Sequence, residues 1–150
     1  MSKIVPLSFA AHGRKTLLPP RGSYRFAAKK VLVPLTLGEF AVSGHRFPIV
    51  FSRFQDSIGT YALLGLAPDE NLFVDPAGRW QGDYVPAQLR HYPFFLGKTG
   101  DGEQKFVLCV DEDSAFLADA GGAPLFDKKG GYSPGLQKLI AAINEYQKAA

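Results

Sequence analysis

The pattern of apolar and polar positions is clearest near the C-terminal end of the chain. There the apolar residues recur at three- and four-residue intervals and form one helical stripe of Leu136, Leu139, Ile140, Ile143 and Tyr146. Ser133 stands at the N-cap position and Pro134 at the first helical position, where its missing N–H costs nothing. The pattern predicts an amphipathic helix from Pro134 onward that packs its stripe against the rest of the domain.

Most other apolar positions fall in short runs separated by Gly, Pro, Asn and Asp, which is typical of strands joined by turns. We predict strands at 4–7, within 24–33, and at 47–51, 60–66, 72–74, 92–96 and 105–110. Short helices are predicted at 36–43, where Thr36 and Glu39 match a capping box, and at 85–90. Residues 111–131 are predicted as a loop-rich segment with a pairing segment near 124–126. Because the strands follow one another without a βαβ rhythm, the predicted fold class is α+β: a mainly antiparallel sheet of short strands, short helices and an amphipathic C-terminal helix.

Charge is unevenly distributed along the 150 residues. The chain has 17 Lys and Arg against 14 Asp and Glu, but no acidic residue precedes Glu39, and seven basic residues do. Residues 1–23, with several Pro and Gly, are predicted as a basic extended arm whose deletion costs little stability, and residues 24–150 as a single domain. Three roles of the arm remain open: docking on an acidic surface, nucleic acid or anionic lipid; solvation alone; or packing on the acidic surface of the domain itself.

Composition excludes several classes of protein. Hydrophobic residues make up 46% and charged residues 21% of the chain, so disorder is not expected for most of it. No run approaches the ~18 apolar residues that cross a bilayer, so no membrane span is expected. The apolar stretch after Lys3 is too short for a signal peptide, which predicts a cytoplasmic location. The single cysteine, Cys109, excludes an internal disulfide.

The motifs that carry common chemistries are missing or incomplete. Gly100-Asp101-Gly102 is followed by Lys105 where a dinucleotide-binding loop needs glycine. The acidic run 111–113 begins like a calcium loop, but Ala115 stands at the next ligand position. The histidines, at positions 12, 45 and 91, are not spaced like metal ligands. We therefore assign no catalytic residue, metal site or cofactor; enzymatic activity stays open, and the sequence favours a non-catalytic protein.

Two similar segments, 45–51 and 90–96, each place Arg and His beside an aromatic-Pro pair after a predicted helix. The candidate binding residues around them are Arg79, Trp80, Tyr84, Arg90, His91, Glu39 and His45. Loops that flank helices commonly present binding groups, and arginines beside aromatic rings suit an anionic or aromatic partner. The alternative is structural, with the aromatic side chains in the core and the arginines paired with Asp75 and Asp83.

A series of short motifs runs from Leu35 to Phe95. The motifs are Leu35-Thr36-Leu37-Gly38-Glu39-Phe40, Phe47-Pro48-Ile49-Val50-Phe51, Ala62-Leu63-Leu64-Gly65-Leu66, Glu70-Asn71-Leu72-Phe73-Val74-Asp75, Gly78-Arg79-Trp80, Tyr84-Val85-Pro86-Ala87 and Arg90-His91-Tyr92-Pro93-Phe94. Together they resemble the SapC family of bacterial proteins, named from a surface-layer-associated protein. The usual pattern has arginine at His91 and tyrosine at Phe47. Relatives continue beyond Gln147, which makes this chain a short member or a truncated one.

The resemblance implies a role in or near a cell-surface assembly, and it brings no catalytic residues. The first hypothesis is a non-catalytic interaction or structural protein that binds a protein partner or other copies of itself. The alternative is a small-ligand-binding domain or an enzyme with its site around residues 79–92. A third hypothesis, binding of nucleic acid or acidic lipid through the basic arm, is disfavoured because the chain from Glu39 onward has 10 basic against 14 acidic residues and would repel phosphates.

Overall fold

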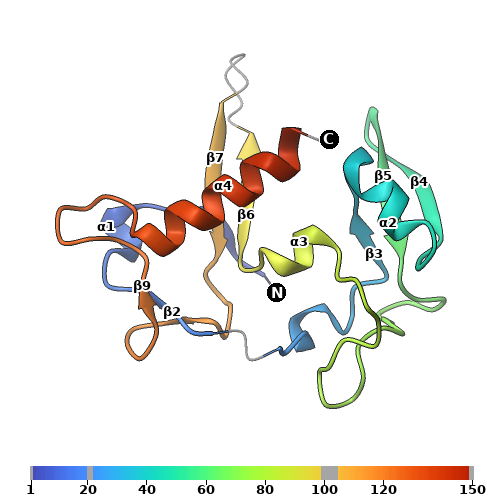
Figure 1. Ribbon diagram of the computed structural model, residues 1–150, viewed down its shortest axis with the longest axis horizontal. Coiled ribbons are helices and arrows are strands. Elements are labelled where there is room, and N and C mark those ends of the chain that lie inside the picture. The colour runs from blue at the N-terminus through green and yellow to red at the C-terminus, as the bar shows by residue number, and fades with distance from the viewer. Residues whose placement is uncertain (1, 20–21, 99–104, 149–150) are drawn as a thin grey trace. The chain divides into compact units, whose positions relative to one another are not determined.

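The computed structural model describes residues 2–19, 22–98 and 105–148 (Figure 1). The chain divides into two compact units: unit 1 comprises residues 1–20 and 91–144, and unit 2 comprises residues 21–90 and 145–150. The described residues form three small antiparallel sheets, several short helices and a long C-terminal helix, which confirms the α+β class. Within these residues, no helix has the length and apolar character needed to span a membrane.

The main sheet of unit 1 joins the two ends of its sequence. Its strand order is β1-β7-β6, with bounds Ile4–Pro6 for β1, Phe106–Asp111 for β7 and Phe94–Lys98 for β6. Ile4 lies opposite Asp111, and on the other side of β7 Val110 lies opposite Phe94. The strand predicted at 4–7 is therefore confirmed, and it pairs with a strand more than a hundred residues away.

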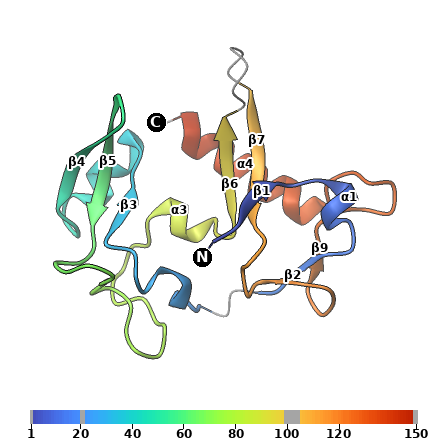
Figure 2. The same ribbon diagram turned by 180° about the vertical axis from the view of Figure 1, so that it is seen from behind.

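Helix α4 (Pro134–Lys148) covers one face of this sheet, in front of it in Figure 1 and behind it in Figure 2. The core residues of unit 1 lie between them: Leu7, Phe94, Leu108, Val110, Leu125, Phe126, Leu136 and Ile143. Leu139 and Ile140 pack against this core at partial burial. The predicted helix is confirmed, and Leu136, Leu139, Ile140 and Ile143 of its stripe lie in or against this core. Burying these side chains stabilises the helix by roughly 25 cal/mol per Å² of apolar area removed from water.

A second small sheet in unit 1 also uses the N-terminal segment. Its strand order is β8-β2-β9, with bounds Leu117–Ala118 for β8, Thr16–Leu17 for β2 and Ala123–Pro124 for β9. Helix α1 (Phe9–His12) lies between β1 and β2 in sequence, and Ser8 caps it by accepting a hydrogen bond from the Ala11 N–H. The first residues of the chain thus supply two strands and a helical turn to unit 1.

Unit 2 is built on the sheet β3-β5-β4, with bounds Leu32–Pro34 for β3, Ser57–Leu63 for β5 and Ile49–Phe54 for β4. Its helical elements are the 3-10 helices η1 (Arg25–Ala27) and η2 (Leu37–Glu39) and the short helices α2 (Phe40–Ser43) and α3 (Ala87–Arg90). Its buried core consists of Ala27, Val33, Leu35, Phe47, Ala62, Leu64 and Leu89. The predicted helices at 36–43 and 85–90 are confirmed.

All four predicted strands of unit 2 are shifted or missing. The strand predicted at 47–51 is β4, which begins and ends later, at Ile49–Phe54. The segment 24–33 begins with η1, and its last two residues lie in β3. Strand β5 begins at Ser57 rather than at residue 60, because Gln55 adopts a left-handed backbone conformation (φ 53°) and closes the hairpin turn earlier. In place of a strand at 72–74, the structure has an isolated bridge between Val74 and Trp80.

The missing strand has a local cause in the side chain of Asn71. Its Oδ1 accepts a hydrogen bond from the Phe73 N–H at 2.9 Å, and its Nδ2 donates to the Ala27 carbonyl at 3.0 Å. A side chain that bonds backbone groups in this way replaces the ladder partners of a strand.

Candidate functional site

Glu39 is a buried carboxylate at the centre of the candidate residues in unit 2. The residue is 5% exposed. It stands at the end of η2, where Thr36 and Glu39 form the predicted capping box, and the Thr36 N–H donates to Oε2 at 3.1 Å. One carboxylate oxygen thus satisfies a backbone donor at the start of its own helical turn.

The other oxygen of Glu39 reaches a distant segment of the chain. Oε1 accepts hydrogen bonds from the Tyr84 hydroxyl and from the Ala87 N–H, both at 2.8 Å. Ala87 is the first residue of α3, so Glu39 also satisfies a backbone donor that the helix leaves open. Burial of a charge is costly unless it is hydrogen-bonded, and here donors engage both oxygens. The carboxylate therefore fastens η2 to the Tyr84–Ala87 segment.

Two tyrosines have their titration changed near this carboxylate. Burial, followed by the hydrogen bond to Glu39, raises the pKa of the Tyr84 hydroxyl. Burial and the negative charge of Glu39 also raise the pKa of Tyr146, one of the last residues of α4 and grouped with unit 2. The Tyr84 hydroxyl, protonated at neutral pH as tyrosine ordinarily is, donates to Glu39.

Trp80 lies in a group of aromatic rings within unit 2. Its ring stacks on Phe73 at a centroid distance of 5.4 Å and meets Phe47 and Tyr24 edge-on. Its indole Nε1–H donates to the carbonyl of Tyr84 at 2.9 Å. Trp80 therefore packs against the core and, through Tyr84, adjoins the Glu39 contacts.

The two candidate arginines lie at the surface. Arg79 is 77% exposed, and its Nε lies 2.9 Å from Oδ2 of Asp75. The Arg79 backbone N–H, followed by its side chain, holds the pKa of Asp75 below its usual value. The guanidinium of Arg90 lies over the Tyr84 ring, 5.6 Å from its centroid, and its Nε donates to the carbonyl of Val85. A binding role of these residues stays a prediction.

Asp83 pairs with Arg46, a residue that the sequence analysis did not select. Arg46 Nε and Nη2 contact the two oxygens of Asp83 at 2.5 and 2.8 Å, and Nη1 donates to the carbonyl of Val42. This two-point contact holds the pKa of Asp83 below its usual value. The segment from Asp75 to Tyr84 thus has an arginine–aspartate pair near each end, at Asp75 and at Asp83.

The two candidate histidines are placed in different units. His45 is exposed and follows α2 in unit 2. His91 is half-buried in unit 1, where its carbonyl accepts a hydrogen bond from the Phe94 N–H at 2.9 Å. Within unit 2, hydrogen bonds join Glu39 to Tyr84 and Tyr84 to Trp80, and the ring of Tyr84 meets Arg90; His45 is not part of this chain of contacts.

A polar cluster in unit 1 escaped the sequence analysis. His12 is 2% exposed, and its Nε2 lies 3.0 Å from Oε1 of Glu112. Lys3 Nζ lies 2.7 Å from the other oxygen of Glu112. Lys3 and then His12 lower the pKa of this carboxyl. The contacts span about a hundred residues, and their only trace in the sequence is the opposite charge of the basic arm and the acidic run 111–113.

Asp111, beside this cluster, is also buried at 2% exposure. Its Oδ1 accepts the backbone N–H groups of Lys3 and Asp113, and its Oδ2 accepts the Tyr92 hydroxyl at 3.0 Å. The acidic run thus binds the N-terminal strand of its own unit. In the described part of the chain, His, Cys, Asp and Glu form no group of three or more that could hold a metal ion.

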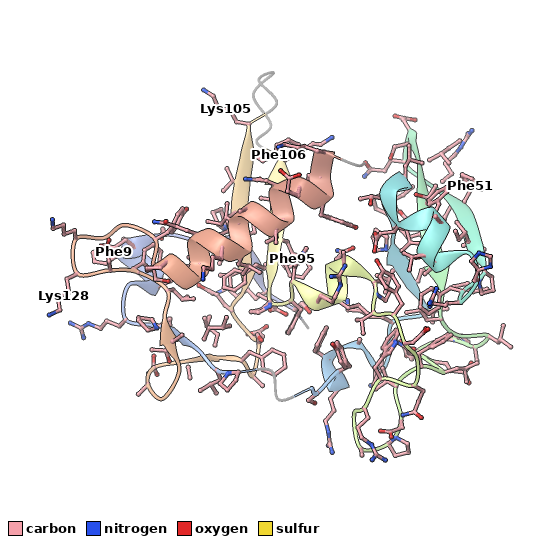
Figure 3. The ribbon with its side chains drawn as sticks, viewed as in Figure 1. Phe9, Phe51, Phe95, Lys105, Phe106 and Lys128 are labelled. Carbon is pink, nitrogen blue, oxygen red and sulfur yellow. The ribbon has the colours of Figure 1, made fainter. Side chains whose placement is uncertain are left out.

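The hairpin of β4 and β5 carries large apolar side chains in solvent. Phe51, Phe54 and Ile58, which we call the hairpin patch, are 70%, 68% and 64% exposed. Figure 3 shows Phe51 on β4, which with β3 forms the outer strands of the sheet. The sequence predicted strands in this region but gave no sign that their apolar residues are uncovered.

Comparison with known proteins identifies one family. A family model described as SapC matches residues 7–150, which include most of both units. No curated protein matches the chain, and no solved structure does.

Proposed function

The chain belongs to the SapC family, and from this membership we propose that it is a non-catalytic interaction protein that binds another protein chain through the hairpin patch. Single exposed apolar residues are common, but large ones gathered on one element mark interaction sites. The exposure of Phe51, Phe54 and Ile58 on one hairpin carries the proposal. The cell-surface assembly that the resemblance implies belongs to the same proposal.

The hairpin patch continues a face of the sheet that is buried elsewhere. Ile49 lies opposite Ala62, and both pack in the core of unit 2, where Ala62 is fully buried. Side chains two positions apart on a strand share a face, so Phe51 lies on this face, as does Ile58, which is opposite Arg53. The apolar face therefore extends past the core of unit 2 into solvent, where a partner would cover it.

Phe54 adds apolar surface on the other side of the hairpin, at its tip. Phenylalanine rings offer a large contact area with few rotatable bonds, and aromatic residues are enriched in protein interfaces. A partner that grips the hairpin tip would thus bury aromatic surface on both faces.

Site-specific photo-crosslinking tests this proposal. A photoreactive phenylalanine analogue is placed at position 51 or 58 of the full chain, in the cells that naturally produce it. The matched control carries the analogue at Leu72, which is also exposed in unit 2 but lies outside the hairpin. We expect a discrete protein adduct from positions 51 and 58 and a much weaker one from position 72.

Equal labelling at all three positions, or no protein adduct at 51 and 58, would contradict the proposal. Mass spectrometry of the adducts identifies the partner chain, which separates a second copy of this protein from a different one.

A further inference from the structure

We propose that the partner of the hairpin patch is a second copy of this chain, joined to the first by antiparallel pairing of the two β4 strands. The inference rests on the proposed function and specifies its partner. The pairing would merge two three-stranded sheets into one six-stranded sheet around a two-fold axis.

The hydrogen-bonding groups of β4 alternate between its inner neighbour and its outer edge. The Leu63 N–H donates to the carbonyl of Pro48 at 2.9 Å, and these residues lie opposite each other in the register of the hairpin. In an antiparallel pair every second residue bonds to the neighbour. Val50, Ser52 and Phe54 therefore bond to β5, whereas Ile49, Phe51 and Arg53 direct their backbone groups to the outer edge. That edge pairs with no strand in the described part of the chain.

The outward N–H and C=O groups of β4 can pair with the same groups of a second copy. If two β4 strands run antiparallel with Phe51 opposite Phe51 of the second copy, Ile49 of each chain faces Arg53 of the other. All outward N–H and C=O groups then find partners, about six hydrogen bonds in total. The charged Arg53 side chains are kept apart by this register, so no like charges lie directly opposite each other.

β4 also lacks the features that usually protect an outer strand. Proline blocks pairing at sheet edges, and the outer strands β1 and β3 contain Pro6 and Pro34. β4 contains no proline, has Arg53 as its single charged residue, and pairs with β5 over its whole length without a bulge. Its edge is therefore open to another strand.

The register also covers the exposed ring of Phe51. Opposite residues of an antiparallel pair lie on the same face, so the two Phe51 rings would pack on each other across the two-fold axis. Ala62, which is buried in the core of unit 2, lies on the same face of the sheet. The interface is small compared with the roughly 800 Å² per partner of a standard complex, so we expect a weak, reversible dimer.

The test measures the oligomeric state of the full chain by sedimentation velocity, from about 5 to about 500 µM. We expect a monomer–dimer equilibrium. Phe51→Lys places two like charges opposite each other and should weaken association by about tenfold or more, and Phe51→Glu should do the same. Because position 51 faces its own copy, an equimolar mixture of the two variants should restore a dimer that contains one of each.

Two further variants keep the result interpretable. Leu72→Lys adds the same charge to an exposed site of unit 2 outside the hairpin and should leave the dimer unchanged. Arg53→Pro removes an N–H that points to the outer edge rather than to β5, so it should block the dimer while the hairpin persists. Thermal melting of every variant checks that unit 2 is folded.

A monomer at every concentration, or a dimer that Phe51→Lys and Arg53→Pro leave unchanged, would overturn the inference. If the crosslinks from position 51 identify a different protein while the chain stays monomeric, the proposed function stands and this inference fails. If neither crosslinks nor dimer form, both fail.

Discussion

Unit 1 and unit 2 are each built around a three-stranded antiparallel sheet, but they bring their strands together over very different lengths of chain. In unit 1, β1 and β7 place Ile4 opposite Asp111. In unit 2, β4 and β5 place Phe54 opposite Ser57. Unit 1 therefore depends on a short segment at one end of the sequence, whereas unit 2 draws its sheet from one continuous stretch.

The contacts that fasten the two units also differ in kind. In unit 1, Glu112 binds Lys3 and His12 and so fixes the N-terminal segment. In unit 2, the buried Glu39 joins two backbone segments beside the aromatic group around Trp80. We therefore expect unit 1 to be sensitive to truncation and to pH, and unit 2 to be sensitive to the loss of a buried hydrogen-bond acceptor.

Deletion of residues 2–19 should have the largest effect. The sequence alone predicted a basic arm at residues 1–23 whose deletion costs little stability, but the structure places β1 and β2 of unit 1 within these residues. We expect hydrogen exchange at the β6 and β7 amides to rise by orders of magnitude, while the β4 and β5 amides stay protected. Retained protection in β7 would show that unit 1 keeps its fold without the N-terminal segment.

Leu136→Ala should have the next largest effect. Leu136 is 3% exposed in the core of unit 1, and its truncation leaves a cavity that should cost about 2–5 kcal/mol of the free energy of unfolding. Leu139→Ala should cost less, because Leu139 is only partly buried. Urea denaturation measures both, with the exposed Lys138→Ala as the matched control on the same helix.

Glu39→Ala tests the fastening of unit 2. It leaves the N–H groups of Thr36 and Ala87 and the Tyr84 hydroxyl without their acceptor, which should cost about 1–3 kcal/mol. Glu39→Gln keeps one acceptor oxygen and should cost less. Equal stability of wild type and Glu39→Ala in urea denaturation would show that these donors find water instead.

Acidification should weaken unit 1 through Glu112. Its pKa is lower in the folded protein than in the unfolded chain, so its contribution to stability is present above the unfolded value of about 4.3. That contribution disappears as the pH falls through the folded value. Thermal melting is measured from about pH 6 to about pH 2, the range in which carboxyl groups titrate. The melting temperature of Glu112→Gln should fall less on acidification than that of wild type. Asp119→Asn, at an exposed carboxylate of unit 1, is the control.

The double substitution Arg79→Ala with Arg90→Ala should have the smallest effect on stability. Both side chains lie at the surface, so we expect a change within about 0.5 kcal/mol. If these arginines bind an anionic or aromatic partner, binding is lost while the melting temperature stays unchanged. An equal loss of binding and stability would assign the segment a structural role.

The features that the sequence predicted are those that short segments determine. The helix from Pro134 and the capping box of Thr36 and Glu39 each depend on residues a few positions apart. The prediction of a strand at 72–74 was wrong because the Asn71 side chain competes for backbone hydrogen-bonding groups. The spacing of apolar residues carries no information about this competition.

The features that the sequence did not predict depend on distant contacts. The pairing of His12 with Glu112 joins residues a hundred positions apart. The second role of Glu39, as acceptor for the first N–H of α3, also required the fold. The exposure of Phe51 could not be predicted either, because alternating apolar residues mark a strand face whether or not the core extends far enough to cover it.

The pairing of β1 with β7 also sets an order of events on the ribosome. At roughly 5–20 residues per second, about 5–20 s separate the synthesis of Pro6 from that of Phe106. All three strands of the β3-β5-β4 sheet have been synthesised once the chain reaches Leu63. Unit 2 can therefore form its sheet before β7, the partner strand of β1, has been synthesised. During that interval the segment that carries β1 has no partner strand, and Lys3, which later binds Glu112, is exposed to water.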